Sequence, residues 1–401
     1  MKILYIHQYF KTPEEGGSIR SYYLAKGLVD NGYEVEMITS HNGKKYEIKD
    51  VDGIRVHYLP VFYDNHLSFL SRIFAFIRFM KLAYEVGRKI KKVDLIYAMT
   101  TPLSVGYLAL RLKKKLGVPY YFEVGDLWPE APIQMGFINN RFLKSFLYGV
   151  EKRIYENADK IIALSSSIRN YIEKTAPGKK VYVIPNMSDV EFFQPANSEK
   201  EHLGKFVISY FGAAGRANRL EYLLEAAKLC HGHLPQVHFK VMAYGSELTR
   251  IRHLAEQTGI QNLEFLPYSN KSGVKKLLDY SDAVYVSFAD VDVLNTGSPN
   301  KFFDGLAAGK LMILNFEGWL KDIVESHKCG FTYNPQYPED FIQKLESIVG
   351  DNHIIREYQN NARKIAEQFY SKELQLKKLL LLLNNEHHLN LSDSEVYILT
   401  A

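Results

Sequence analysis

Short apolar runs alternate with amphipathic helical patterns along the first half of this chain. The amphipathic patterns predict helices at residues 18–31 and 104–116. The apolar runs predict strands at residues 2–7, 34–39, 95–99, 120–124, 160–164 and 180–184. Because strands alternate with helices, we expect a parallel sheet that is covered by helices on both faces.

The same pattern begins again after residue 205. It predicts strands at 206–210, 239–243, 263–265, 283–286 and 311–314, and helices at 220–231, 247–257, 274–280 and 300–308. The polar stretch 185–205 predicts a linker. We therefore expect a Rossmann-like domain at residues 1–190 and a second at 191–370. A long helix is predicted at 352–384, so that residues 371–401 form its end and a tail from about Glu386.

Composition narrows the class of protein. The 401 residues are 46% hydrophobic and 24% charged, which indicates a folded chain, and the net charge of +5 is too small to indicate nucleic-acid binding. Cys230 and Cys329 lie far apart and predict neither a disulfide framework nor a zinc site. Charges interrupt the longest apolar region, so we expect no transmembrane helix. The first residues read as a strand rather than a signal peptide.

Each half carries a glycine-containing loop after its first strand. Gly16 and Gly17 open a helix, where glycines let backbone N–H groups approach a ligand and the helix N-terminus favours an anion. In the second half, Gly212 is followed by Arg216 and Arg219, whose guanidinium groups suit a diphosphate. The alternatives are a simple tight turn in the first loop and surface arginines in the second.

The segment 295–310 contains residues that are typical of the start and the end of a helix. Ser298 suits the helix cap, Pro299 its first turn and Gly309 its end. The helix start then offers free N–H groups beside Lys301 and the preceding Thr296 and Gly297. Asp304 follows about one turn later, where it could accept hydrogen bonds from sugar hydroxyls. The alternative is a capped helix whose charged residues are only solvated.

A third candidate group stands at the end of the strand at 120–124. Ligands of open α/β sheets bind outside the carboxyl ends of the strands. Glu123, Asp126 and Trp128 lie at such an end, and His7 ends the first strand. We expect these residues and Arg20 to border the cleft. The alternative is a structural loop with Trp128 in the core.

The segment 62–92 interleaves aromatic and aliphatic residues with arginines and lysines. Part of this helix must pack on its domain, and the rest could lie in a lipid interface with its basic groups on anionic headgroups. The alternative, an amphipathic core helix with a solvated basic face, is equally compatible with the pattern. Residues 141–148 repeat the pattern more weakly.

Several segments together resemble the large retaining glycosyltransferase family four of GT-B fold. The resemblance lies at residues 1–10, 16–18, 125–130, 158–165, 184–186 and 298–310, and it extends over nearly the whole chain. It is closest to bacterial enzymes of O-antigen, capsule and related polysaccharide assembly, including the fucosamine-transferase-like group. The resemblance implies two Rossmann-like domains that face a central cleft, with a C-terminal helix that crosses back to the N-terminal domain.

The resemblance also implies roles for single residues. Gly16 and Gly17 would border the donor phosphates, and Arg216 and Arg219 would hold the diphosphate. Asp126 falls where relatives place a His or Asp that faces the reacting sugar.

One position departs from the family pattern. Relatives carry two glutamates separated by seven residues, whereas this chain has Thr296 at the first position and Asp304 at the second. Asp304 would accept hydrogen bonds from the ribose hydroxyls, and Lys301 would supply positive charge in this part of the donor site. Asp290 and Asp292 could hold a metal ion in principle, but the resemblance argues against that use.

The implied activity is retaining transfer of a hexose from a nucleotide sugar, of the UDP class and possibly N-acetylated, to a lipid-linked saccharide. No metal, cofactor or nucleic acid is expected, and the implied location is the inner face of the cell membrane, as a peripheral protein. Two alternatives are a nucleotide-sugar 2-epimerase of the same fold and a non-catalytic membrane-associated protein. The epimerase would need acid/base carboxylates and histidines in the cleft.

Overall fold

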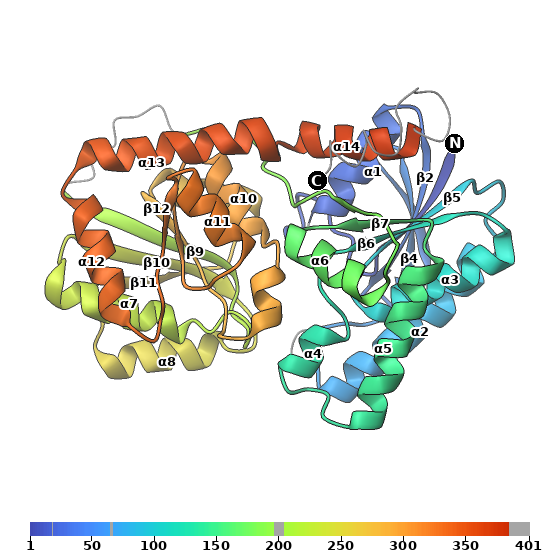
Figure 1. Cartoon of the computed structure of the whole chain (residues 1–401), viewed down its shortest axis with the longest axis horizontal. Coiled ribbons are helices and arrows are strands. Elements are labelled where there is room, and N and C mark those ends of the chain that lie inside the picture. The colour runs from blue at the N-terminus through green and yellow to red at the C-terminus, as the bar shows by residue number, and fades with distance from the viewer. Residues whose placement is uncertain (18, 65–66, 196–203, 385–401) are drawn as a thin grey trace.

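Two sheets, each covered by helices on both faces, form the two halves of the computed structural model (Figure 1). The structure describes residues 1–17, 19–64, 67–195 and 204–384. The tail predicted from about Glu386 lies outside these residues. The predicted arrangement of two Rossmann-like domains is confirmed.

The N-terminal sheet has eight strands in the order β3-β4-β2-β1-β5-β6-β7-β8. Its strands are β1 (Lys2–Ile6), β2 (Glu34–His41), β3 (Glu47–Val51), β4 (Ile54–Pro60), β5 (Leu95–Met99), β6 (Tyr120–Val124), β7 (Lys160–Ala163) and β8 (Val181–Val183). Its helices are α1 (Arg20–Asp30), α2 (Phe69–Gly87), α3 (Leu103–Leu116), α4 (Glu130–Gln134), α5 (Arg141–Asn157) and α6 (Ser166–Thr175).

The C-terminal sheet has six parallel strands in the order β11-β10-β9-β12-β13-β14. Its strands are β9 (Phe206–Ala213), β10 (Val237–Tyr244), β11 (Leu263–Leu266), β12 (Ala283–Val286), β13 (Leu311–Leu314) and β14 (Gly330–Thr332). Its first helices are α7 (Glu221–His233), α8 (Leu248–Thr258), α9 (Lys271–Asp279), the 3-10 helix η1 (Asp292–Thr296) and α10 (Asn300–Ala307). They are followed by α11 (Trp319–Ser326), α12 (Pro338–Val349) and α13 (Asn352–Ile365).

The strands that the apolar runs predicted are all present, with ends shifted by up to three residues. The central strands are buried on both faces, and Tyr5 of β1 lies in register with Met37 of β2 and Tyr97 of β5. Three strands were missed, namely β3, β4 and β14. β3 and β4 form an antiparallel pair at the sheet edge, and the exposed Lys49 shows why β3 lacks an apolar pattern.

The prediction of a single long helix at 352–384 is wrong. The segment folds as α13, a π-helical turn η2 (Ala366–Tyr370) and α14 (Lys372–Asn384). Ser371 between them is extended, with ψ of 148°, and bridges to Ser188 of the linker.

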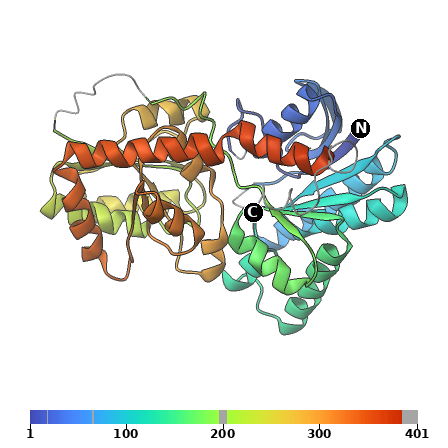
Figure 2. The ribbon, with the colours of Figure 1, turned by 45° about the horizontal axis from the view of Figure 1, so that its top comes forward.

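The crossing of the C-terminal helix back to the N-terminal domain is confirmed. Figures 1 and 2 show α13 on one domain and α14 on the other. Leu379, Leu382 and Leu383 of α14 are buried against the N-terminal domain, and Tyr33 Oη donates to Asn384 Oδ1 at 2.6 Å. Within the part of the chain that the structure describes, no helix is long and apolar enough to span a membrane.

Candidate active site

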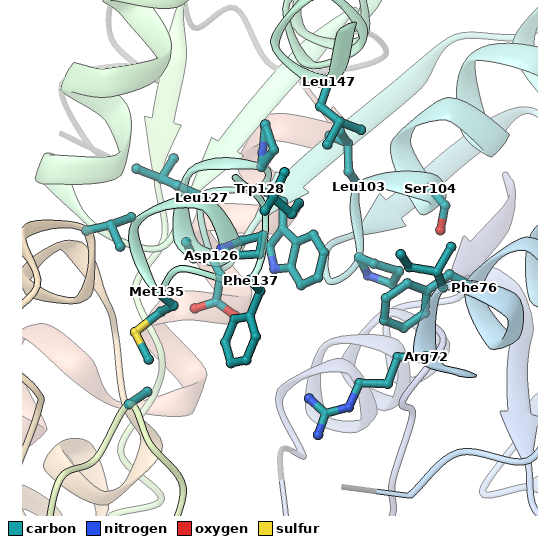
Figure 3. A pocket seen from close by; sticks show the side chains of 18 of the residues that line it. Arg72, Phe76, Leu103, Ser104, Asp126, Leu127, Trp128, Met135, Phe137 and Leu147 are labelled. Carbon is teal, nitrogen blue, oxygen red and sulfur yellow. The ribbon is translucent and has the colours of Figure 1, made fainter. Parts of the chain in front are cut away.

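A large cavity, here called the interdomain cavity, lies between the carboxyl ends of the two sheets (Figure 3). Its volume is about 1340 Å³. The N-terminal domain lines it with Asp126 and Trp128 after β6 and with residues of α2, α3 and α5. The C-terminal domain contributes Gly215 and Arg216 after β9, and Thr296 and Gly297. The cavity therefore brings together predicted site residues from three segments that lie 80 or more positions apart in the chain.

Among the described residues that line the cavity, Asp126 carries the one carboxylate. It directly follows Gly125 at the end of β6 and is exposed to the cavity space. Figure 3 shows its carboxyl group beside the ring of Phe137. The surrounding protein walls desolvate the carboxylate and raise its pKa above 3.8.

Trp128 forms part of the cavity wall and also packs on the core. Its indole meets the ring of Phe76 edge to face, with 5.9 Å between the ring centroids. It is partly buried against the core cluster of the N-terminal domain. The cleft interpretation and the core interpretation of Trp128 therefore both hold.

Arg20 and Glu123 lie beneath the cleft rather than at its surface. Their exposed fractions are 1% and 0%, respectively. Arg20 Nε donates to Glu123 Oε1 at 2.8 Å, and Arg20 Nη2 donates to the carbonyl of Ile184 at 2.9 Å. The expectation that these two side chains border the cleft is thus not met, because each satisfies the charge of the other inside the domain.

His7 is also buried, with 3% of its surface exposed. Its Nδ1 lies 2.7 Å from Ser21 Oγ. Burial lowers the pKa of His7 to about 3, so the imidazole is neutral at physiological pH. Neutral His7, directly after β1, can hydrogen-bond to Ser21 but carries no positive charge.

Gly16 and Gly17 form a turn that faces the C-terminal domain. Their φ angles are 71° and 90°, in the left-handed region that favours glycine. A Cβ on Gly16 would lie 3.5 Å from Tyr268 Oη and 3.7 Å from Asn270 Cα. The turn is therefore close to the C-terminal domain, but neither glycine is among the described residues that line the interdomain cavity.

Lys301 lies against the glycine loop of β9. A Cβ on Gly212 would be 3.7 Å from Lys301 Nζ, and that Nζ lies 3.8 Å from the centroid of the Tyr210 ring. The described residues offer this buried ammonium group no hydrogen-bond acceptor. Burial lowers the pKa of Lys301 to about 7. An unpaired buried cation costs free energy unless an anion joins it.

Asp304 lies one turn after Lys301 on α10. Burial raises the pKa of Asp304 to about 7, against the opposing effect of nearby Lys271. Lys271 itself donates to Asp189 of the linker and to Tyr23 Oη of α1. Asp304 is therefore placed where α10, α9, the linker and the N-terminal domain meet.

Thr296 and Ser298 have partners within the protein. Thr296 Oγ1 donates to the carbonyl of Val293 at 2.7 Å. Ser298 does not cap α10, contrary to the expectation, because the N-cap is Pro299. Ser298 Oγ instead accepts the backbone N–H of Asn186 at 3.2 Å, which ties the segment to the linker.

The two arginines of the β9 loop diverge. Arg216 lines the cavity, and its guanidinium lies 5.5 Å from the ring of Phe137 across the cleft. Arg219 lies outside the cavity lining and stacks on Tyr222 at 4.8 Å. Of the two, Arg216 faces the space that Asp126 faces.

Residues on α2 and α5 complete the cavity wall, and sequence reasoning did not place them there. Phe76, Met80 and Leu147 are among them. The signal was the apolar content of 62–92 and 141–148, which indicated a lipid interface without indicating a cavity. Among the described residues, no cluster of three His, Cys, Asp or Glu side chains could hold a metal ion.

Comparisons with known proteins agree with this architecture. A family model described as Glycosyltransferase Family 4 matches residues 15–192, and one described as Glycosyl transferases group 1 matches residues 189–369. The chain is 22% identical over 389 residues to WcaI of Escherichia coli, a glycosyl transferase assigned to colanic acid biosynthesis, covering 89% of this chain and 93% of WcaI.

Two solved structures share the fold. Sucrose-phosphate synthase of Thermosynechococcus elongatus superposes with a TM-score of 0.77 at 17% identity, covering 96% of this chain and 98% of that chain. HepE of Anabaena, solved in complex with UDP, superposes with a TM-score of 0.68 at 18% identity, covering 96% of this chain and 100% of that chain. The two matched models together span both domains, and the chain belongs to the family 4 glycosyltransferases of GT-B fold.

Proposed function

We propose that this enzyme transfers a hexose from a nucleoside-diphosphate sugar of the UDP class to a lipid-linked saccharide, with retention of the anomeric configuration. One observation carries the proposal. Asp126 of the N-terminal domain and Arg216 of the C-terminal domain line the same cavity. A carboxylate and a guanidinium on opposite walls suit a reaction in which a sugar leaves a diphosphate.

The donor is bound by the C-terminal domain in this proposal. Arg216 and the N-terminus of α10 meet the diphosphate, and the unpaired ammonium of Lys301 lies against Gly212, where phosphate oxygens would neutralise it. Asp304 accepts hydrogen bonds from the hydroxyl groups of the ribose. HepE, which shares the fold, was solved with UDP and with UDP-glucose, which supports the UDP class.

The chemical step needs no metal ion in this proposal. The bond between the anomeric carbon and the diphosphate oxygen breaks, and the acceptor hydroxyl forms the new bond on the same face. The hydroxyl proton passes to the departing phosphate, and nucleoside diphosphate leaves. Positive groups stabilise its developing charge, while Asp126 orients the acceptor hydroxyl or the reacting sugar.

The acceptor side is the N-terminal domain. Phe74 of α2 is 71% exposed, and Phe142 and Phe146 of α5 are 81% and 66% exposed. Exposed basic side chains lie beside them, including Arg78 and Arg141. Apolar groups flanked by basic groups suit peripheral binding to the anionic inner face of the cell membrane. The likeness to WcaI supports a role in assembling a cell-surface polysaccharide.

The epimerase alternative finds less support. Such an enzyme needs several acid/base groups around the sugar, but Asp126 is the one carboxylate among the described residues that line the cavity, and no histidine lines it. His7 is buried and neutral.

A nucleotide panel tests the proposal. UDP, GDP, ADP and the matching sugars are added in thermal-shift measurements, with and without EDTA. We expect UDP to raise the melting temperature and EDTA to have no effect. The same enzyme with UDP-sugar and a lipid-linked saccharide should release UDP and lengthen the saccharide. Isomerised UDP-sugar without acceptor would favour the epimerase, and no shift with any nucleotide would favour the non-catalytic protein.

A further inference from the structure

The interdomain cavity extends well beyond the residues that would meet the reacting sugar. From Asp126 it continues into the N-terminal domain between α2, α3 and α5. Met80, Leu103, Leu147 and Val150 line this part with aliphatic and thioether groups. The volume of about 1340 Å³ exceeds the roughly 300–1,000 Å³ that is usual for small-molecule sites. The deep part therefore has room for a second, apolar group.

The apolar part opens to the outside through exposed apolar side chains. Ile77, Leu143 and Phe146 line the cavity and are also 39%, 41% and 66% exposed. They continue into Phe74 and Phe142, which are exposed beyond the lining. Exposed apolar groups that cluster in this way mark an interaction site. A hydrocarbon chain could thus follow apolar side chains from a bilayer to the cavity.

The charges of the lining favour an anionic ligand. Arg72 of α2, Arg153 of α5 and Arg216 line the cavity, whereas Asp126 is the one carboxylate that the described residues contribute to the lining. Figure 3 shows the Arg72 side chain beside Phe76, so that a cation and an apolar surface are adjacent. Apolar walls with a cationic border match an amphiphile that has a phosphate next to its chain.

We propose that the cavity binds the acceptor's hydrocarbon chain, so that the enzyme takes the lipid phosphate or diphosphate and the first part of the chain into the N-terminal domain. This inference rests on the proposed function, because it requires a lipid-linked acceptor. It adds that the lipid itself is a recognised part of the substrate. Each methylene that enters the cavity strengthens binding up to about fourfold.

Chain length provides the first test. Inorganic pyrophosphate, geranyl diphosphate and farnesyl diphosphate are titrated into the full-length protein by calorimetry, below micelle-forming concentrations. Saturating UDP is present so that the donor site is occupied. We expect affinity to rise at least tenfold from geranyl to farnesyl diphosphate, with an increasingly negative heat-capacity change, which is the signature of apolar burial. Equal affinities for pyrophosphate and farnesyl diphosphate would overturn the inference.

A pair of variants on one helix provides the second test. Val150→Phe adds volume inside the cavity, whereas Lys152→Phe adds the same side chain to the exposed face of α5. We expect Val150→Phe to weaken farnesyl diphosphate binding at least tenfold and Lys152→Phe to leave it unchanged. UDP binding, measured on both, shows that each variant is folded.

These experiments distinguish a failure of the proposed chain site from a failure of the proposed function. If wild-type protein binds UDP and transfers sugar but binds farnesyl diphosphate no better than pyrophosphate, the chain site is wrong and the transferase remains. If wild-type protein binds no nucleotide, the proposed function fails. Binding only to vesicles, with none to the monomeric lipid, would indicate a surface contact and would also overturn the chain site.

Discussion

Arg20 and Glu123 form a two-point ion pair inside the N-terminal domain, with Nε–Oε1 and Nη2–Oε2 distances of 2.8 and 3.1 Å. The pair joins α1 to β6, the strand whose end presents Asp126. Tyr97 Oη donates a further hydrogen bond to Glu123. The pair thus fixes the position of the candidate catalytic loop without contacting the cavity.

We expect Glu123→Ala to destabilise the protein by about 3–5 kcal/mol, because it leaves the buried charge of Arg20 without a partner. Urea unfolding followed by circular dichroism measures the change. The control is Glu317→Ala, which removes the partner of Lys321 from a surface pair in which Glu317 is 67% exposed, and should cost less than about 1 kcal/mol. Similar losses in the two variants would contradict this account of the pair.

Asp126→Asn tests the chemistry. The substitution removes the carboxylate but keeps the size of the side chain, so we expect the rate of transfer to fall by a factor of about 100 or more. UDP affinity should stay within about twofold, because the proposed donor contacts lie in the other domain. The matched control is Asp290→Asn, an exposed aspartate whose Oδ2 accepts from Gln336 at 3.2 Å. Near-normal turnover by Asp126→Asn would remove Asp126 from the mechanism.

Arg216→Ala tests the diphosphate site. A charge-assisted hydrogen bond contributes about 1.5–3 kcal/mol, so UDP should bind roughly 10- to 100-fold more weakly. Calorimetry measures the Kd directly. Arg252→Ala on α8, where the guanidinium stacks on Phe265 at 5.5 Å, is the control and should leave Kd unchanged. Arg219→Ala is measured beside them, and we expect it to have the smaller effect because Arg219 stacks on Tyr222 outside the cavity.

The pKa of Asp304 predicts a pH-dependent stability. Burial raises this pKa from 3.8 to about 7, so between about pH 4 and 7 the folded chain holds a proton that the unfolded chain has released. The contribution of Asp304 to stability is therefore lost as the pH rises through this window, by at most about 1.4 kcal/mol per unit.

Asp304→Asn should remove that loss. The variant should gain stability over wild type progressively from pH 4 to 7, and the gain should then stay constant to pH 8. Urea unfolding at pH 4, 5.5, 7 and 8 gives the two curves. A difference between the curves that does not vary with pH would show that the carboxyl is ionised throughout.

The pKa of Lys301 predicts that nucleotide binding depends on pH. The cause here is a lowered pKa, whereas that of Asp304 is raised. Burial lowers the pKa of Lys301 to about 7, so the nucleotide-free protein loses this cation as the pH rises from 7 to 9. UDP affinity should fall over that range, by no more than about tenfold per unit. Calorimetry at pH 7 and 9 measures the fall. Lys301→Met should bind UDP more weakly at pH 7 and show little further change at pH 9.

The fold could be predicted because local patterns determine it. Apolar runs such as the one at β5 are buried on both faces, and that burial leaves a clear mark in the sequence. The edge strand β3 leaves no such mark, since residues 48–50 are exposed. The break at Ser371 was missed for another reason. The helical pattern continues on both sides of it, and the break depends on a contact with Ser188 in a distant segment.

The candidate site was predictable in part. Asp126 and Arg216 follow strands at the sheet edges where ligands bind, and the structure places both on the cavity. The burial of Arg20 could not be predicted, because its partner Glu123 lies 103 positions away. The divergence of Arg216 and Arg219 depends on which aromatic ring each one meets, and spacing alone does not determine that.

The contact between Ser188 and Ser371 limits how the domains can move. Within the residues that the structure describes, the chain crosses between the domains twice, and both crossings meet here: Ser188 N–H donates to Tyr370 O at 2.7 Å and Lys372 N–H to Ser188 O at 3.1 Å. Because the two crossings are hydrogen-bonded to each other, a relative motion of the domains has to carry both of them together. Ser165 Oγ of the N-terminal domain also donates to Thr296 O of the C-terminal domain at 2.7 Å. A wider opening of the cleft between Asp126 and Arg216 therefore has to break that second contact as well.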